Sequence, residues 1–100
     1  MYAVIFTARI SELDETYART AARMRELAHS KYGCARFTAV VEGDQEISIS
    51  YWESLDQIRA WNQDPEHRTA QELGREKWYS SFQVQVVQVI REYAFGAPEG

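Results

Sequence analysis

The chain of 100 residues is 45% hydrophobic and 26% charged, with a formal net charge of -4. Chains of this length build one hydrophobic core, no apolar run approaches the ~20 residues of a membrane span, and the basic residues form no stripe for a phosphate backbone. These properties exclude a second domain and argue against membrane and nucleic-acid partners.

The single cysteine, Cys34, leaves no possibility of an internal disulfide. The apolar stretch at residues 1–6 lacks a basic leader and is soon interrupted by Arg9, so a strand explains it better than a signal peptide does. We therefore expect a cytoplasmic protein.

Residues 2–9 carry β-forming side chains on both alternating sets of positions, which predicts a strand covered on both faces. A loose capping box, Ser11 followed by Asp14, then precedes apolar residues at helical spacing that end before Gly33. The apolar stripe consists of Leu13, Tyr17, Ala21, Met24, Leu27 and Ala28. It predicts one amphipathic helix of about five turns.

Two alternating runs follow, at residues 35–41 and 47–51. They flank a turn at residues 42–44 that contains glycine. This arrangement predicts a β-hairpin.

Two short helices are predicted after the hairpin. Ser54 and Gln57 form a capping box, and Asp64 before Pro65 places an N-cap ahead of a proline at the first helical position, so the second helix begins at an angle. One stripe of the second helix comprises His67, Ala70, Gly74 and Trp78. Gly74 indicates that a backbone or a ligand approaches closely, and we interpret it as close packing of helix on sheet.

The last run, Ser80 to Tyr93, exceeds the usual strand length of about 5–6 residues. Its alternation changes phase at Val86 and Val87, which predicts either a bulge there or a strand whose far half meets a different neighbour. We expect residues 1–95 to form a single domain and residues 96–100 a flexible tail.

The order strand, helix, strand, strand, helix pair, strand predicts an α+β fold of the ferredoxin-like split βαβ type with an antiparallel sheet. Helices would cover one face of this sheet. The other face carries too many apolar residues to meet water, so we expect two copies to pack sheet against sheet as a symmetric homodimer. The overlong last strand would reach the partner, and the dimer would form an α/β barrel.

The most distinctive residues are Tyr51-Trp52-Glu53-Ser54 and Trp61, followed by Pro65-Glu66-His67, Ala70-Gln71, Gly74-Arg75 and Trp78-Tyr79. On these residues and the order of its elements, the chain resembles the antibiotic biosynthesis monooxygenase (ABM) superfamily of dimeric α+β barrels, in particular its small uncharacterised bacterial members. The resemblance covers nearly the whole chain.

The resemblance implies a cofactor-independent monooxygenase, in which an electron-rich phenol or quinol is bound in an apolar pocket, deprotonated, and itself reduces dioxygen. That chemistry needs a dry cavity, a donor for the developing oxyanion and a base near neutral pH. Trp61 and His67 are the catalytic candidates by residue type. His67 lies in the first helical turn, where the dipole disfavours the imidazolium. A hydrogen bond to the inter-helix turn is the alternative role of His67, and a core position that of Trp61.

Four further residues are candidates for substrate binding. Gln71 and Arg75 lie one turn apart on one flank of the second short helix. Arg75 could hold an anionic oxygen, with an exposed salt bridge to a neighbouring glutamate as the alternative. Thr7 and Tyr51 would add hydroxyl donors if their strands direct them toward the helices.

No metal or nucleotide cofactor is expected, because ligand spacings and phosphate loops are absent from the sequence. Haem is the rival ligand. The haem-degrading branch pairs an asparagine on the first strand with a tryptophan and a histidine in the later half of its helix. This chain keeps the tryptophan at Trp61 but has Thr7 or a neighbour in place of the asparagine. Its own histidine, His67, comes early in the helix, and Gln71 stands nearer the expected position of the ligand. Glutamine is a poor iron ligand, which argues against haem. Two alternatives to an enzyme stay open: a pocket that binds haem or a small apolar molecule without turnover, and a purely structural dimer.

Overall fold

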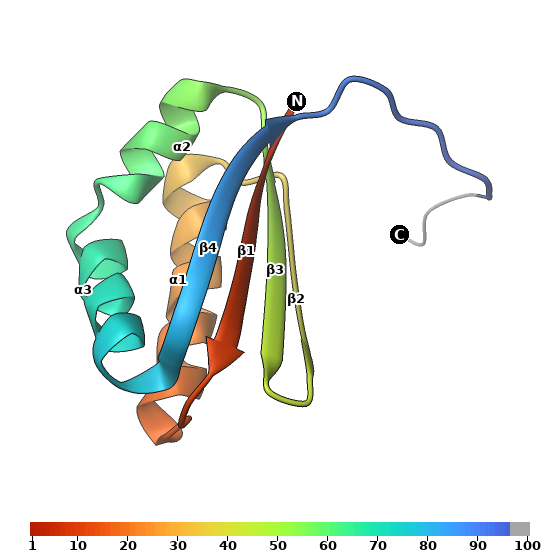
Figure 1. The fold of residues 1–100 in the computed structure, drawn as a ribbon. Coiled ribbons are helices and arrows are strands. Elements are labelled where there is room, and N and C mark those ends of the chain that lie inside the picture. Colours follow the sequence, from red (N-terminus) through yellow and green to blue (C-terminus); the bar gives the residue numbers. More distant parts are fainter. Residues whose placement is uncertain (97–100) are drawn as a thin grey trace.

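The computed structural model describes residues 1–96, so the expected flexible tail lies outside the described residues except for Gly96. The elements are β1 (Tyr2–Ile10), α1 (Glu15–Tyr32), β2 (Arg36–Glu42), β3 (Gln45–Trp52), α2 (Leu55–Asn62), α3 (Pro65–Leu73), a π-helical turn η1 (Gly74–Trp78) and β4 (Tyr79–Gln88). The strands form one antiparallel sheet in the order β2-β3-β1-β4, and the helices lie on one side of it (Figure 1). The predicted α+β fold is confirmed. Among residues 1–96 no helix is both long and apolar enough to cross a membrane.

Helix α1 begins at an aspartate cap and ends at a glycine in the left-handed conformation. Its N-cap is Asp14, whose carboxylate accepts the Tyr17 N–H at 3.0 Å, so Ser11 is not the cap and its predicted role is wrong. The helix ends at Gly33, which has a φ of 76°. A Cβ there would approach Gln57 Nε2 to 2.8 Å, so glycine is required both by its conformation and by the close approach of α2.

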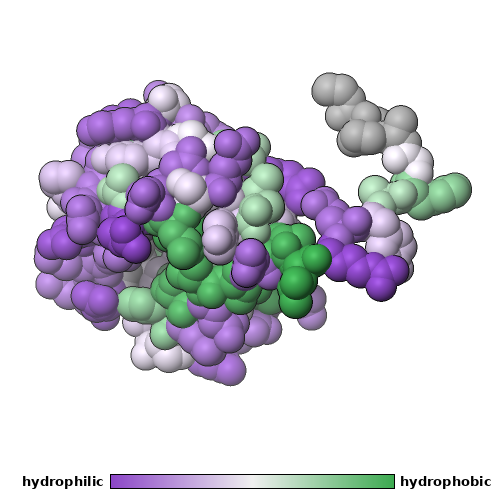
Figure 2. All heavy atoms as spheres, turned by 90° about the horizontal axis from the view of Figure 1, so that it is seen from above, coloured by the Kyte–Doolittle hydropathy of each residue, from purple (hydrophilic) through white to green (hydrophobic). Residues whose placement is uncertain are grey.

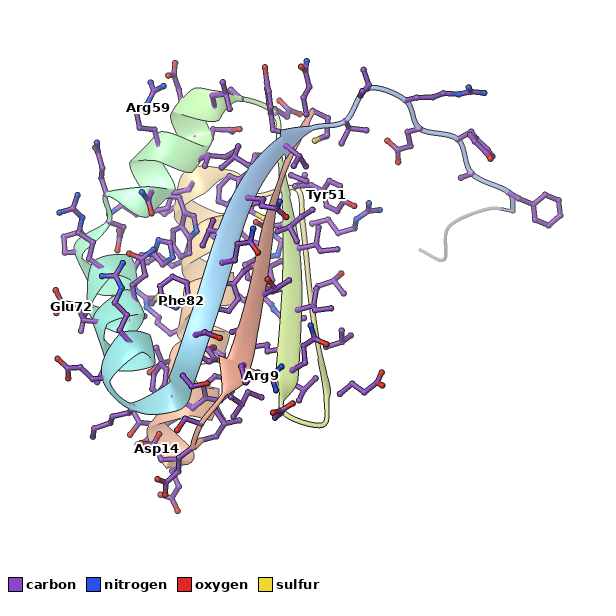
Figure 3. The ribbon with its side chains drawn as sticks, viewed as in Figure 1. Arg9, Asp14, Tyr51, Arg59, Glu72 and Phe82 are labelled. Atoms are coloured by element: carbon purple, nitrogen blue, oxygen red, sulfur yellow. The ribbon has the colours of Figure 1, made fainter. Side chains whose placement is uncertain are left out.

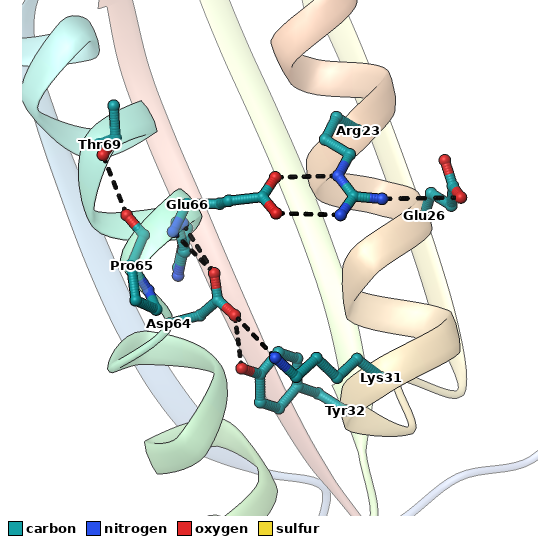
Figure 4. Close-up of polar contacts among 9 residues, drawn as sticks. Arg23, Glu26, Lys31, Tyr32, Asp64, Pro65, Glu66 and Thr69 are labelled. Atoms are coloured by element: carbon teal, nitrogen blue, oxygen red, sulfur yellow. Dashed lines mark hydrogen bonds and ion pairs between the residues drawn. The ribbon is translucent and has the colours of Figure 1, made fainter.

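The break between α2 and α3 is held by one buried carboxylate. Asp64 caps α3 by accepting the backbone N–H groups of Glu66 and His67, and its other oxygen accepts the Tyr32 hydroxyl at 2.5 Å. The hydrogen bond from Tyr32 holds the pKa of Asp64 below its usual value. Close by, Arg23 of α1 binds Glu66 through two bonds of 2.9 Å (Figure 4). These contacts fasten the start of α3 to α1.

Strand β4 differs from its predicted course. It ends at Gln88, and its pairing with β1 is regular from Tyr2↔Gln88 to Arg9↔Ser81. The irregularity lies at the other end of the strand, between Arg9 and Ile10, so the bulge predicted at Val86 and Val87 is wrong. The Val89 N–H still donates to the Met1 carbonyl at 3.0 Å, and the described residues after it, 90–96, lead away from the body of the molecule (Figure 1).

Alternation along the strands decides which side chains meet the helices. In β1 these are Val4, Phe6 and Ala8, and in β3 they are Glu46, Ser48, Ser50 and Trp52. The intervening side chains, among them Ile5, Ile47, Ile49 and Tyr51, point to the opposite face. The helices therefore cover one face of the sheet, and the apolar alternate residues of β3 lie on the other.

The core gathers where β3 ends beneath α1 and α2. Trp52 is 0% exposed, its indole N–H donates to Ser50 Oγ at 2.9 Å, and its ring stacks on Trp61 at 6.2 Å between centroids. Leu27, Ala28, Cys34 and Ile58 complete this buried cluster.

Trp52→Ala should lower the free energy of unfolding by about 3–5 kcal/mol, because it removes the largest fully buried side chain and leaves a cavity. Urea denaturation measures this loss. The control Tyr93→Ala, at a side chain that is 87% exposed, should change stability by less than about 0.5 kcal/mol. A similar, small effect of both substitutions would contradict this description of the core.

Candidate functional site

A cavity of about 480 Å³ lies between the helices and the sheet. Every helix and every strand contributes to its wall, which is mainly apolar. Its polar side chains are Tyr17, Thr20, Arg25, Glu46, Ser48, Ser50, Arg59, Asn62, His67, Gln71 and Tyr79. Such a volume and composition are typical of small-molecule sites.

Trp61 and His67 form one wall of the cavity. Their rings stack at 4.0 Å between centroids and 14° between planes, because the break before α3 turns the first helical turn back over α2. His67 Nδ1 lies 3.0 Å from the Trp61 carbonyl oxygen. The hydrogen bond to the inter-helix turn and a place in the cavity wall were alternatives for His67 in the sequence, and the structure has both, because the ring that bonds to the Trp61 carbonyl also lines the cavity.

The surroundings of the His67 ring favour its neutral form. Burial lowers its pKa, against the opposing effects of the Trp61 carbonyl and Asp64. A neutral ring that donates Nδ1–H to Trp61 keeps a lone pair on Nε2. Among the described residues every buried side-chain nitrogen or oxygen has a partner, and none is found for Nε2, so this atom is accessible. It can accept a proton from a ligand.

A second polar group, missed in the sequence, lies under the other end of the helices. Glu46 is 5% exposed and accepts the hydroxyl hydrogens of Tyr17 and, at 2.8 Å, of Tyr79. Burial raises the pKa of Glu46, which the bond from Tyr79 partly opposes. Burial and the neighbouring Glu46 likewise raise the pKa of Tyr79. The cavity therefore contains a carboxyl biased toward its protonated form.

Gly74 and the π-helical turn position Tyr79. A Cβ on Gly74 would lie 3.0 Å from Tyr79 Cδ2, so the absence of a side chain lets the tyrosine ring pack against the helix. Close packing, the interpretation of Gly74 made from the sequence, is confirmed. Trp78, in the same turn, is 4% exposed and donates its indole N–H to Asp14 at 3.1 Å. Turns of π-helix occur frequently at functional sites.

The four expected substrate-binding residues are divided by the structure. Gln71 lines the cavity and its amide donates to Asn62 at 3.3 Å. Arg75 is not among the lining residues, and its guanidinium lies over the ring of Phe82, which does line the cavity, at 5.5 Å from the ring centroid.

Thr7 and Tyr51 lie on the wrong face of the sheet for the cavity. Both alternate with residues that meet the helices, and Arg36 stacks over the Tyr51 ring at 4.4 Å on the opposite side. Figure 3 shows Tyr51 directed away from the helices and Phe82 toward them. The sequence left open which face Thr7 and Tyr51 use, and the strand register directs both away from the cavity.

The sequence did contain a signal for Glu46. Glu46, Ser48 and Ser50 alternate with the apolar Ile47, Ile49 and Tyr51, and the usual assumption directs the apolar set at the helices. Only Trp52 indicates the opposite orientation, because it alternates in step with Glu46 and so belongs to the set of side chains on the same face.

Comparison with known proteins places this geometry in a family. The antibiotic biosynthesis monooxygenase family matches residues 1–73. An uncharacterized protein, YqjZ of Bacillus subtilis strain 168, is 43% identical over 95 residues, which cover 94% of this chain and 83% of that protein.

Two solved structures share the fold. SnoaB, a cofactor-independent oxygenase from Streptomyces nogalater, superposes with a TM-score of 0.77 at 14% identity, covering 91% of this chain and 94% of SnoaB. Rv0793 from Mycobacterium tuberculosis gives a TM-score of 0.78 at 14% identity, covering 93% of this chain and 98% of that one. The family match and the 43% identical relative show that the chain belongs to the antibiotic biosynthesis monooxygenase family.

Proposed function

We propose that the protein is a monooxygenase that oxidises a small phenol or quinol with dioxygen, without a prosthetic group. The observation that carries the proposal is the His67 ring, stacked on Trp61 with Nε2 accessible, in an apolar cavity of about 480 Å³. SnoaB, whose fold this chain shares, is a cofactor-independent oxygenase, which supports the same class of chemistry here.

In this proposal His67 is the general base. Nε2 takes the hydroxyl proton of the phenol, and the positive charge that forms on the ring is stabilised by Nδ1–H donation to the Trp61 carbonyl, 3.0 Å away. The phenolate is a far better electron donor than the phenol, so deprotonation lets the substrate reduce dioxygen. The apolar wall excludes water from the reactive species that follow.

Trp61 supports the base and shapes the pocket. It is 7% exposed, and its ring stacks with both Trp52 and His67. This stack fixes the plane of the imidazole and hence the direction of Nε2. Gln71 adds an amide to the same wall and is a candidate for holding a second substrate oxygen.

Haem fits these side chains poorly. Among residues 1–96 His67 is the one imidazole in the cavity wall, and the amide of Gln71, which stands nearer than His67 to the expected position of the haem-degrading branch's histidine, bonds to Asn62. We propose that the cavity works without haem, and a haem titration with no shift of the Soret band is the expected outcome.

We also propose that the protein forms a homodimer through the uncovered sheet face. Ile5, Ile47, Ile49 and Tyr51 lie together there, with Val40 and Val87, at 57% and 37% exposure, beside them. Figure 2 shows exposed apolar side chains close to where the C-terminal segment leaves the body. Large apolar patches of this kind mark interfaces between proteins.

His67→Phe should reduce kcat for oxygen consumption and quinone formation by a factor of about 100 or more, because the ring keeps its stacking on Trp61 but loses the base. A panel of naphthols and hydroquinones with an oxygen electrode makes the measurement. His29→Phe is the matched control, since His29 bonds to the Cys34 carbonyl outside the cavity wall. Wild-type protein without activity on the whole panel, or equal activity of the two variants, would contradict the proposal.

The acid limb of the pH profile should lie below pH 6.5, the ordinary pKa of histidine. Burial penalises the charged ring, so the neutral base persists to a lower pH than in water and activity falls only as the pH drops through the lowered pKa. The profile of kcat/KM between neutral and acidic pH tests this. An acid limb above pH 6.5 would assign the base to another group.

Ile49→Asp should convert the dimer to a monomer, because it places a charge at the centre of the apolar sheet face, opposite Ile5 on β1. Analytical ultracentrifugation gives the mass, and circular dichroism verifies the fold. Leu13→Asp adds the same charge outside the sheet and should leave the dimer intact. A wild-type protein that sediments as a monomer at micromolar concentration would overturn this interface.

A further inference from the structure

An acid and five aromatic side chains gather beside the π-helical turn, and none of them takes part in the proton transfer proposed for His67. The acid is Glu46, near the start of β3, and all six side chains line the cavity. Neighbouring rings have their centroids 5.3 to 6.5 Å apart. The five rings are those of Phe6, Tyr17, Trp78, Tyr79 and Phe82. We call these six side chains the acidic aromatic box.

The rings of the box meet at steep angles, as walls do. The Tyr17 ring stands at 88° to the rings of both Trp78 and Tyr79. The face of an aromatic ring carries partial negative charge, which attracts a cation that lies within about 6 Å of the ring centre. Phe82 already makes such a contact, since the Arg75 guanidinium lies over its ring at 5.5 Å. A space walled by these rings therefore favours a positively charged ligand group.

Glu46 lacks the counter-ion that a buried carboxylate needs. It is 5% exposed, and among residues 1–96 no cation forms a salt bridge with it. Of the described residues, two arginines line the cavity, and they are directed elsewhere, Arg25 over the Phe37 ring and Arg59 to Asp56. Burying a carboxylate without a cation costs stability, and an apolar side chain would fill the same space without that cost. A ligand that brings the positive charge would account for this acid.

The two tyrosines orient the Glu46 carboxyl and leave part of it free. Tyr17 donates its hydroxyl hydrogen to Oε1, and Tyr79 donates to Oε2 at 2.8 Å. An ionised carboxylate has about four lone-pair sites, so about two are left for another donor. Without a cation, burial raises the pKa of Glu46 and favours the protonated carboxyl. A cation beside the group favours the carboxylate instead, so a bound ammonium ion would replace the proton.

We propose that the acidic aromatic box binds the ammonium group of a small organic amine, with an N–H donating to Glu46 and the rings around the positive charge. A metal ion suits the box less well, because Glu46 is the one acid that lines the cavity among residues 1–96 and metal ions need several ligands. The inference goes beyond the oxygenase function and does not depend on it, since His67 and Trp61 are not part of the box.

Benzylamine and benzyl alcohol test the proposal, because the two compounds have nearly the same shape and only the amine is charged at neutral pH. In isothermal titration calorimetry the wild-type protein should bind benzylamine more tightly than benzyl alcohol by about tenfold or more. Glu46→Gln keeps the size of the side chain and removes its charge, so this preference should fall to about twofold or less. Glu42→Gln, at an exposed acid at the end of β2, is the matched control and should keep the preference.

A second readout shows where the amine binds. The indole N–H signals in a ¹⁵N NMR spectrum report separately on Trp78 in the box, on Trp61 beside His67 and on the fully buried Trp52. We expect benzylamine to shift the Trp78 signal more than the other two. Phe82→Leu, which removes one wall and keeps the acid, should weaken the binding of benzylamine more than that of benzyl alcohol.

Three results would each overturn the amine site. These are equal affinity of the wild-type protein for the two compounds, a preference for the amine that survives in Glu46→Gln, and a largest shift at Trp61, which would place the amine beside His67. The comparison in the wild-type protein decides the question even if circular dichroism shows that a variant does not fold. Oxygen consumption is measured separately, so a failure of the oxygenase function leaves this test unchanged.

Discussion

Strand β3 directs most of its polar side chains at the helices and its apolar isoleucines away from them. This orientation gives the cavity its polar groups and leaves the uncovered face of the sheet apolar. Glu46, Ser48 and Ser50 bring a carboxyl and two hydroxyls beneath the helix layer, where larger apolar side chains would have filled the space. Ile47 and Ile49 are correspondingly placed on the face that no helix covers. A one-residue shift in the register of β3 would exchange the two sets and remove the polar part of the cavity. The tryptophan at the end of the strand opposes that shift, because Trp52 is fully buried only on the helix side.

The second determinant of the site is the break between α2 and α3. Pro65 has no backbone N–H to continue the hydrogen bonding of the preceding helix, and Asp64 supplies the N-cap that starts a new helix. Because the Asp64 carboxylate also binds Tyr32, the direction of α3 is set relative to α1, and the first turn of α3 brings His67 onto Trp61. The position of the proposed base thus depends on a buried cap several residues away from the chemistry. The same dependence holds at the other end of the cavity, where Gly74 sets the position of Tyr79 and, through it, of Glu46.

Much of the fold could be predicted from the sequence because its signals are local. The capping box at Ser54, the Asp64–Pro65 start and the glycine after Tyr32 each depend on residues within one helical turn, and each is found as expected. The positions of His67 and Trp61 followed from the same signals.

The errors arose where a side chain's environment depends on distant strands. Thr7 and Tyr51 were candidates for the pocket only on the condition that they face the helices, because alternation gives two sets of side chains but does not say which set meets the helices. Glu46 was overlooked for the same reason, since its partners Tyr17 and Tyr79 are 29 and 33 residues away in the sequence. Arg75 was misplaced because the chain leaves α-helical geometry at Gly74, and a helical stripe cannot be extrapolated through a π-helical turn.

The most direct test of the account is a crystal structure of the protein with bound para-cyanophenol, a phenol that resists oxidation. The account predicts the phenol hydroxyl within hydrogen-bonding distance of His67 Nε2, with the ring beside Trp61. Phenol bound on the uncovered sheet face near Tyr51, or a cavity closed by side chains while the ligand lies outside it, would contradict it.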